Sequence, residues 1–118
     1  MKTDTEKLEY LNKVLYSNYT SLNEVPWSYI TMFQKLSEDF IREFQDEINW
    51  EDISYSQKLS EDFIREFKDK VNWRYISISQ KLSEDFIREF KEKVDWYCIA
   101  KHQKLSKTFI REFQDRIE

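Results

Sequence analysis

The sequence predicts an all-α fold: an α-solenoid of four tandem 23-residue helical hairpins behind an N-terminal capping helix. Tryptophans recur every 23 residues, at Trp27, Trp50, Trp73 and Trp96. The string QKLSEDFIREF occurs unchanged at 34–44, 57–67 and 80–90, and a close variant, QKLSKTFIREF, occupies 103–113. A fixed period of this length is the signature of a repeat array. Glycine is absent and proline occurs once, which argues against folds built on tight β-turns.

The tryptophan spacing also sets the predicted boundaries. The repeats are expected at 27–49, 50–72, 73–95 and 96–118, with residues 1–26 as the capping helix and its connection, all in one structural domain. Leu8, Leu11, Val14 and Leu15 predict an amphipathic capping helix over about 5–17. The connection that follows ends at Pro26.

Each repeat carries the signals of two short helices. In the second repeat the first helix is expected from about Trp50 to Gln57 behind an Asn49 cap, a role that Asn72 and Asp95 repeat. The second helix should begin after Ser60, with Glu61 paired to Arg65 four residues later. The expected core of this repeat and its equivalents is Trp50, Ile53, Leu59, Phe63, Ile64, Phe67 and Val71.

Composition limits the setting in which the chain works. The formal net charge is −4, which argues against a general affinity for nucleic acid or anionic lipid. No stretch resembles a secretory signal or a membrane span, and the lone Cys98 excludes an internal disulfide. We therefore expect a cytoplasmic protein that does not engage the membrane.

The pattern WxxISxxQKLSEDFIREF, read at 50–67 and 73–90, resembles a short helical repeat of uncharacterised proteins from large DNA viruses, bacteriophages and some bacteria. The resemblance covers 27–118 and includes no catalytic motif. It implies a viral or phage protein acting in the host cytoplasm. Its implied role is to bind and inhibit a host protein, including one of a defence complex.

One pair of residues has the spacing for chemistry. Cys98 and His102 are four residues apart on one predicted helix, so a thiol and an imidazole could meet as nucleophile and base. No glycine-rich oxyanion loop or third orienting residue accompanies them, and two ligands are too few for a zinc site. We interpret the pair as incidental and predict no enzyme activity, no cofactor and no metal.

Positions that drift between repeats, while the rest stay fixed, concentrate on the first helix of each hairpin. Stacked first helices of a solenoid line one face, so these residues should form an aromatic and mixed-charge strip of interface composition. We predict a protein-binding module that uses this strip, although the same side chains could instead pack between hairpins. The candidate protein-binding residues are Tyr29, Met32, Phe33, Asp52, Tyr55, Arg74, Tyr75, Ile78, Tyr97, Lys101 and His102.

Two alternatives remain open. Basic residues that recur every 23 positions could follow a phosphate backbone, although acidic neighbours oppose this. These candidate nucleic-acid-binding residues are Arg42, Arg65, Arg88, Arg111, Lys35, Lys58, Lys81 and Lys104. Self-assembly is the other alternative, through the stacking face of the C-terminal repeat.

Overall fold

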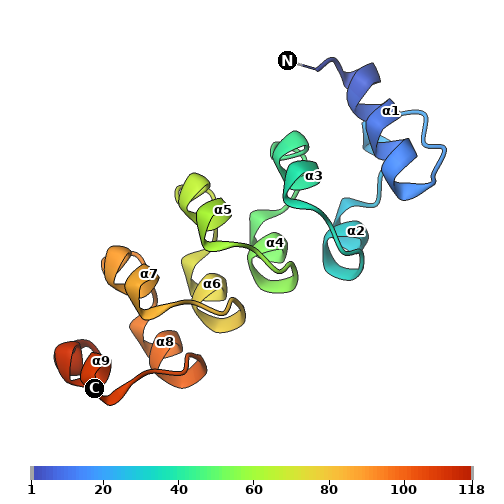
Figure 1. Cartoon of the computed structure of the whole chain (residues 1–118). Coiled ribbons are helices and arrows are strands. Elements are labelled where there is room, and N and C mark those ends of the chain that lie inside the picture. Colours follow the sequence, from blue (N-terminus) through green and yellow to red (C-terminus); the bar gives the residue numbers. More distant parts are fainter. Residues whose placement is uncertain (1, 118) are drawn as a thin grey trace. The chain divides into compact units, whose positions relative to one another are not determined.

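The computed structural model describes residues 2–117, and every regular element in this range is a helix (Figure 1). The predicted all-α fold class is therefore confirmed. The elements in chain order are α1 (Asp4–Leu15), a short 3-10 helix (Leu22–Glu24), α2 (Trp27–Phe33), α3 (Glu38–Glu43), α4 (Trp50–Ser56), α5 (Glu61–Glu66), α6 (Trp73–Ser79), α7 (Glu84–Glu89), α8 (Trp96–His102), α9 (Lys107–Glu112) and α10 (Gln114–Ile117).

Internal contacts divide the chain into two compact units, Met1–Asn49 and Trp50–Glu118. The first unit holds α1 to α3, and the second holds α4 to α10. The boundary coincides with a predicted repeat boundary, between the first and second hairpins. Our assignment of all four hairpins to one domain stays a prediction.

In the first unit, α1 packs on the first repeat as a capping helix should. Leu11 of α1 is fully buried, and the Tyr10 ring centroid lies 6.1 Å from that of Phe40 in α3. The ammonium of Lys2 lies 3.8 Å from the carboxylate of Glu43. The helix covers residues 4–15, slightly earlier than the predicted 5–17.

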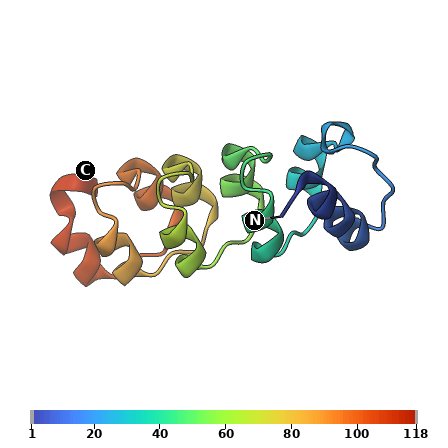
Figure 2. The same cartoon turned by 90° about the horizontal axis from the view of Figure 1, so that it is seen from above.

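In the second unit, the helical hairpins stack in chain order. Helix α4 contacts α6, and α6 contacts α8, so the first helices of successive repeats are neighbours. Figure 1 shows these three as one row beside a second row of α5, α7 and α9, and Figure 2 shows the same succession from above. Helices of six or seven residues are not stable alone in water, so the stacking has to supply most of the stability.

Polar side chains fix where the short helices begin. The Ser60 hydroxyl accepts a hydrogen bond from the backbone N–H of Phe63 at 3.1 Å. The Asn72 side chain accepts one from the N–H of Tyr75 at 3.0 Å, and Asp95 caps α8 in the same way. These contacts satisfy donors that have no partner inside the first turn, and they confirm the predicted caps at these three residues.

An aromatic cluster forms the centre of each repeat. Phe63 is fully buried, and its ring centroid lies 4.7 Å from that of Phe67, which lies 5.0 Å from Trp50. The next repeat has the same two separations. The tryptophans are only half-buried, so the prediction that they belong to the core was wrong in this respect. The Trp73 indole N–H donates to the backbone oxygen of Lys68 at 2.9 Å, which holds the ring at the edge of the cluster.

Glutamines at the C-terminal ends of the first helices join consecutive repeats. The Gln80 amide nitrogen donates to the backbone oxygens of Gln57 at 2.6 Å and Ser54 at 3.0 Å, near the end of α4. Its amide oxygen accepts from the backbone N–H of Leu59 at 3.0 Å. Gln103 makes the same three contacts one repeat later. We call this three-bond arrangement the glutamine clamp, and it satisfies helix-end carbonyls that a short helix leaves unpaired.

The predicted pair between Glu61 and Arg65 is not a direct hydrogen-bonded pair, although the charge of Glu61 helps to raise the pKa of Arg65. The Glu61 carboxylate accepts from the backbone N–H of Ser83 at 2.6 Å and from its hydroxyl at 3.0 Å. Glu84 binds Ser106 with the same geometry. The prediction missed this hydrogen-bond partner because it considered only residues on the same helix, whereas the first-turn glutamate reaches the cap of the following repeat.

We predict that Gln80→Ala lowers the free energy of unfolding by about 2–4 kcal/mol, because two buried carbonyls and one buried N–H lose their partner together. Urea denaturation followed by circular dichroism measures the effect. Lys81→Ala is the matched control, because Lys81 is adjacent and exposed. Equal stability of the two variants would contradict the clamp.

Candidate protein-binding surface

The first unit exposes three large apolar side chains on one short helix, α2. Tyr29 is 59% exposed, Met32 41% and Phe33 71%. The rings of Tyr29 and Phe33 lie 5.1 Å apart at their centroids, as expected for residues one helical turn apart. Within the first unit, therefore, none of these three side chains belongs to the buried core.

In the second unit, the predicted strip residues differ in exposure. Tyr55 is 52% exposed and Tyr97 is 74% exposed. Arg74, Lys101 and His102 are also exposed, whereas the remaining candidates are half-buried: Asp52, Tyr75 and Ile78. The strip is thus divided, with part of it exposed and part half-buried.

Stacking brings strip residues of different repeats together. The Tyr55 ring meets the Tyr75 ring edge-on, with centroids 5.5 Å apart. This contact joins α4 to α6, and Tyr75 is less exposed than Tyr55. Farther along the unit, the ammonium of Lys101 lies 5.9 Å from the Tyr97 ring centroid, a cation–π arrangement on the surface.

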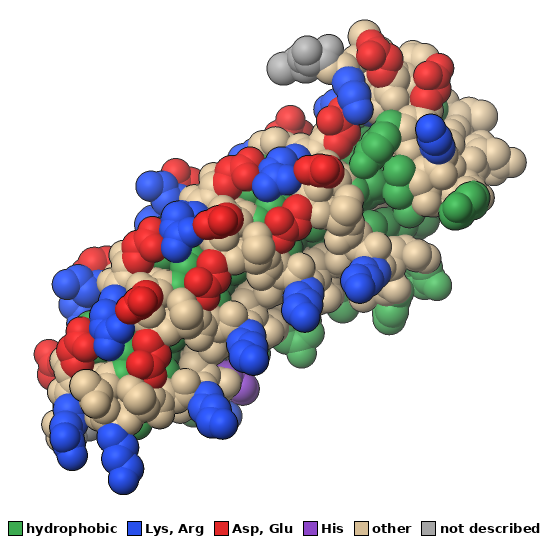
Figure 3. All heavy atoms as spheres, viewed as in Figure 1, with side chains coloured by type: hydrophobic (Ala, Val, Ile, Leu, Met, Phe, Trp, Pro, Cys, Tyr) green, Lys and Arg blue, Asp and Glu red, His purple; other side chains and the backbone are tan. Residues whose placement is uncertain are grey.

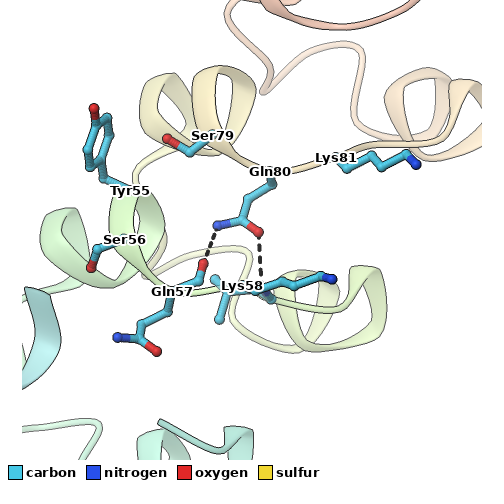
Figure 4. Close-up of a pocket in the computed structure, with 8 residues that line it drawn as sticks. Tyr55, Ser56, Gln57, Lys58, Ser79, Gln80 and Lys81 are labelled. Carbon is cyan, nitrogen blue, oxygen red and sulfur yellow. Dashed lines mark hydrogen bonds between the residues drawn. The ribbon is translucent and has the colours of Figure 1, made fainter. Parts of the chain in front are cut away.

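A shallow hollow of about 280 Å³ opens where the second and third repeats meet (Figure 4). Figure 4 shows Gln80 at its base with both ends of the amide engaged in the clamp, while Lys58 and Lys81 extend away in the same direction. Tyr55 and Ser79 complete much of the rim. The volume of the hollow is just below the usual range for small-molecule sites. The Gln80 amide at its base is already hydrogen-bonded in the clamp.

Cys98 and His102 do not form a reactive pair. Cys98 is 5% exposed and lies in the core, whereas His102 is exposed at the end of α8. Burial raises the pKa of the Cys98 thiol, with a smaller contribution in the same direction from Asp95, while Arg74 acts against it. A thiol that stays protonated at neutral pH is a poor nucleophile.

Other kinds of site find little support in the part of the chain that the structure describes. Between residues 2 and 117, no three His, Cys, Asp or Glu side chains gather in an arrangement that could hold a metal ion. Within the same range, no helix combines the length and apolar character needed to cross a bilayer.

Three arginines of the predicted row form ion pairs: Arg42, Arg65 and Arg88. In the second unit, Arg65 binds both carboxylate oxygens of Glu89 at 2.8 Å and also binds Asp62 at 2.6 Å. Arg88 is held in the same way by Glu112 and Asp85. On this unit, acidic and basic side chains alternate along the ridge of the second helices (Figure 3). Two arginines of the row are therefore neutralised by contacts that bridge repeats.

The predicted lysine row differs from the arginine row. Lys58, Lys81 and Lys104 are exposed, and none of them forms an ion pair with a residue that the structure describes. Lys35 of the first unit is exposed as well, and Arg42 there pairs with Asp39 at 2.9 Å. Unlike the paired arginines Arg42, Arg65 and Arg88, the lysines keep their charge free for a partner.

Comparison of this chain with protein-family models, curated proteins and solved structures finds no match. Its role must therefore be argued from its own residues. The resemblance to viral and phage repeats stays a prediction.

We predict that Glu89→Gln lowers the melting temperature at neutral pH and that this difference disappears in acid. The hydrogen bond from Arg65 lowers the pKa of Glu89, so its stabilising effect is present above the ordinary glutamate pKa of about 4.3. That effect is lost as the pH falls through the lowered value. Melting curves between about pH 7 and pH 2 test this. Asp115→Asn, at an exposed carboxylate, is the control, and a difference that persists unchanged at the lowest pH would contradict the bridge.

Proposed function

We propose that this chain is a non-catalytic protein-binding repeat module that uses the outer face of its first helices. The observation that carries the proposal is the exposure of Tyr29, Met32 and Phe33 on α2. Exposed aromatic clusters of this kind are typical of protein interfaces, where a few rings supply much of the binding energy.

The apolar residues that fold the first repeat are separate from this cluster. Ile30 is 4% exposed and Leu36 8%, while Phe40 is fully buried. The hydrophobic core is therefore complete without Tyr29 and Phe33. Covering these two rings in a complex would contribute about 25 cal/mol for each Å² of apolar surface removed from water.

The second unit offers a more polar extension of the same kind of surface. Tyr55 and Tyr97 present rings, and Arg74, Lys101 and His102 present polar and charged groups. Aromatic centres with a polar surround match the composition of transient protein interfaces. The resemblance to viral and phage repeats makes a host protein, including a component of a defence complex, the partner that we propose to test first.

Two other functions each have one supporting observation. The free lysine row favours nucleic-acid binding, although the neutralised Arg65 and Arg88 weaken that case. Self-assembly is favoured by Ile110, which is 40% exposed although its equivalents Ile64 and Ile87 are fully buried. Neither observation involves as much exposed aromatic surface as α2 presents.

We expect the double variant Tyr29→Ser, Phe33→Ser to keep its fold and lose its partner. Exposed substitutions change stability by about 0.5 kcal/mol or less each, so the melting curve should hardly move. Affinity capture from host-cell extract, followed by mass spectrometry, then identifies proteins that bind the natural chain and not the variant.

The matched control is Tyr16→Asn. Tyr16 is 97% exposed outside α2 and has a positive φ of 54°, which asparagine tolerates. This variant also removes an exposed ring and should capture the same proteins as the natural chain. Unfolding of the double variant, or capture that does not depend on it, would refute the proposal.

A further inference from the structure

The four repeats have nearly the same sequence but not the same charge. Counting Lys and Arg against Asp and Glu, the net charges of 27–49, 50–72, 73–95 and 96–118 are −3, −2, 0 and +2. The second unit alone therefore changes sign along its length. Although the chain is acidic overall, its last repeat carries a net positive charge.

The basic side chains of the last repeat are exposed and lie close together in the sequence. They come from the outer side of α8, from the link that follows it, and from α9. Together with one exposed tyrosine they form what we call the C-terminal basic surface: Tyr97, Lys101, His102, Lys104, Lys107 and Arg111.

The charges on this surface are not matched as they are in the earlier repeats. Asp62 and Asp85 pair with the arginines three residues later, at 2.6 and 2.9 Å. The corresponding residue in α9 is Thr108, and no described carboxylate forms an ion pair with Arg111.

The replacement of an acidic residue by Lys107 also destabilises α9 itself. Lys107 replaces a glutamate in the first turn of α9, where a positive charge opposes the helix dipole, and it lies four residues from the like charge of Arg111. The acidic first turn that α5 and α7 share is thus absent from α9. Departures of this kind are expected where a surface serves binding.

We propose that the C-terminal basic surface docks an acidic segment of the partner protein. This inference rests on the proposed protein-binding function and specifies the chemistry of the partner. Carboxylates of the segment pair with Lys101, Lys104, Lys107 and Arg111, while the Tyr97 ring supplies apolar contact beside them. The two kinds of contact are already adjacent, because the Lys101 ammonium lies 5.9 Å from the Tyr97 ring centroid.

The distribution of charge favours a protein segment over a nucleic acid. At physiological salt, screening limits an exposed charge to about 8 Å, close to the distance between packed helices. The favourable field therefore extends over little more than one repeat. A nucleic acid carries charge continuously along its length and would also meet the repeat at 50–72, whose net charge is −2 and which exposes Glu51. A short acidic segment can engage the last repeat alone.

The test is the affinity of the full-length chain for a short fluorescein-labelled peptide of Glu and Gly, measured by fluorescence anisotropy at physiological salt. The charge-reversed variant Lys101→Glu, Lys104→Glu should weaken binding about tenfold or more. The control variant Lys58→Glu, Lys81→Glu has the same net charge and changes the two lysines that are equivalent to Lys104 in the earlier repeats. It should weaken binding no more than about twofold, through the long-range field alone. Circular dichroism melting shows whether both variants keep the fold.

Three results would overturn the inference. They are no binding of the peptide, equal weakening by the two variants, and tighter Lys101- and Lys104-dependent binding of a labelled oligothymidylate of matched charge. If the peptide does not bind, capture from extract that still requires Tyr29 and Phe33 would leave the protein-binding proposal intact. If the peptide does not bind and this capture also fails, both the inference and the protein-binding proposal are refuted.

Discussion

The glutamine clamp is the interaction on which the stacked repeats of the second unit depend. Helices as short as α4 and α6 leave backbone carbonyls unpaired at their ends, and those carbonyls cannot remain buried without donors. Gln80 supplies both donor bonds and one acceptor bond from the next repeat, and Gln103 repeats this one repeat later. A glutamine that is not docked on its neighbour leaves three polar groups without partners, so each repeat requires its neighbour to be in register.

Because the core and the glutamine clamp hold the repeats together, the outer face of the first helices is free to vary. The inner face of α6 buries Ile76 and Ser77, and its link carries the clamp residue Gln80. The outer positions hold Arg74, Tyr75 and Ile78. Arg74 and Ile78 differ from their equivalents in every other repeat, and Tyr75 has a tyrosine equivalent only in the first repeat. Because the core and the clamp do not constrain these outer residues, they can become acidic in one repeat and basic in another without changing the fold. The net charge accordingly rises along the second unit while the aromatic clusters keep the same separations.

Much of this fold could be predicted from the sequence, because its signals are local or periodic. The tryptophan spacing gave the repeats, and the serine caps and the buried phenylalanines and isoleucines agree with the structure. Contacts between repeats were harder to predict, because periodicity shows that positions are equivalent without showing which atoms meet. No partner was therefore predicted for Gln80, and the partners of Glu61 and Arg65 in the following repeat were missed. The glutamine that recurs at 34, 57, 80 and 103 was an available signal. The same limit applied to the candidate surface, where Tyr75 proved half-buried and in contact with Tyr55 of the preceding repeat.

The most direct test of the central claim is hydrogen exchange at the backbone N–H groups of Leu59 and Leu82, which donate to the clamp oxygens of Gln80 and Gln103. Both amides lie in links between helices, where unclamped N–H groups exchange quickly. The clamp predicts that they exchange as slowly as amides inside the helices, because each is released only when neighbouring repeats separate. Rapid exchange at these two positions in an otherwise folded protein would contradict the account.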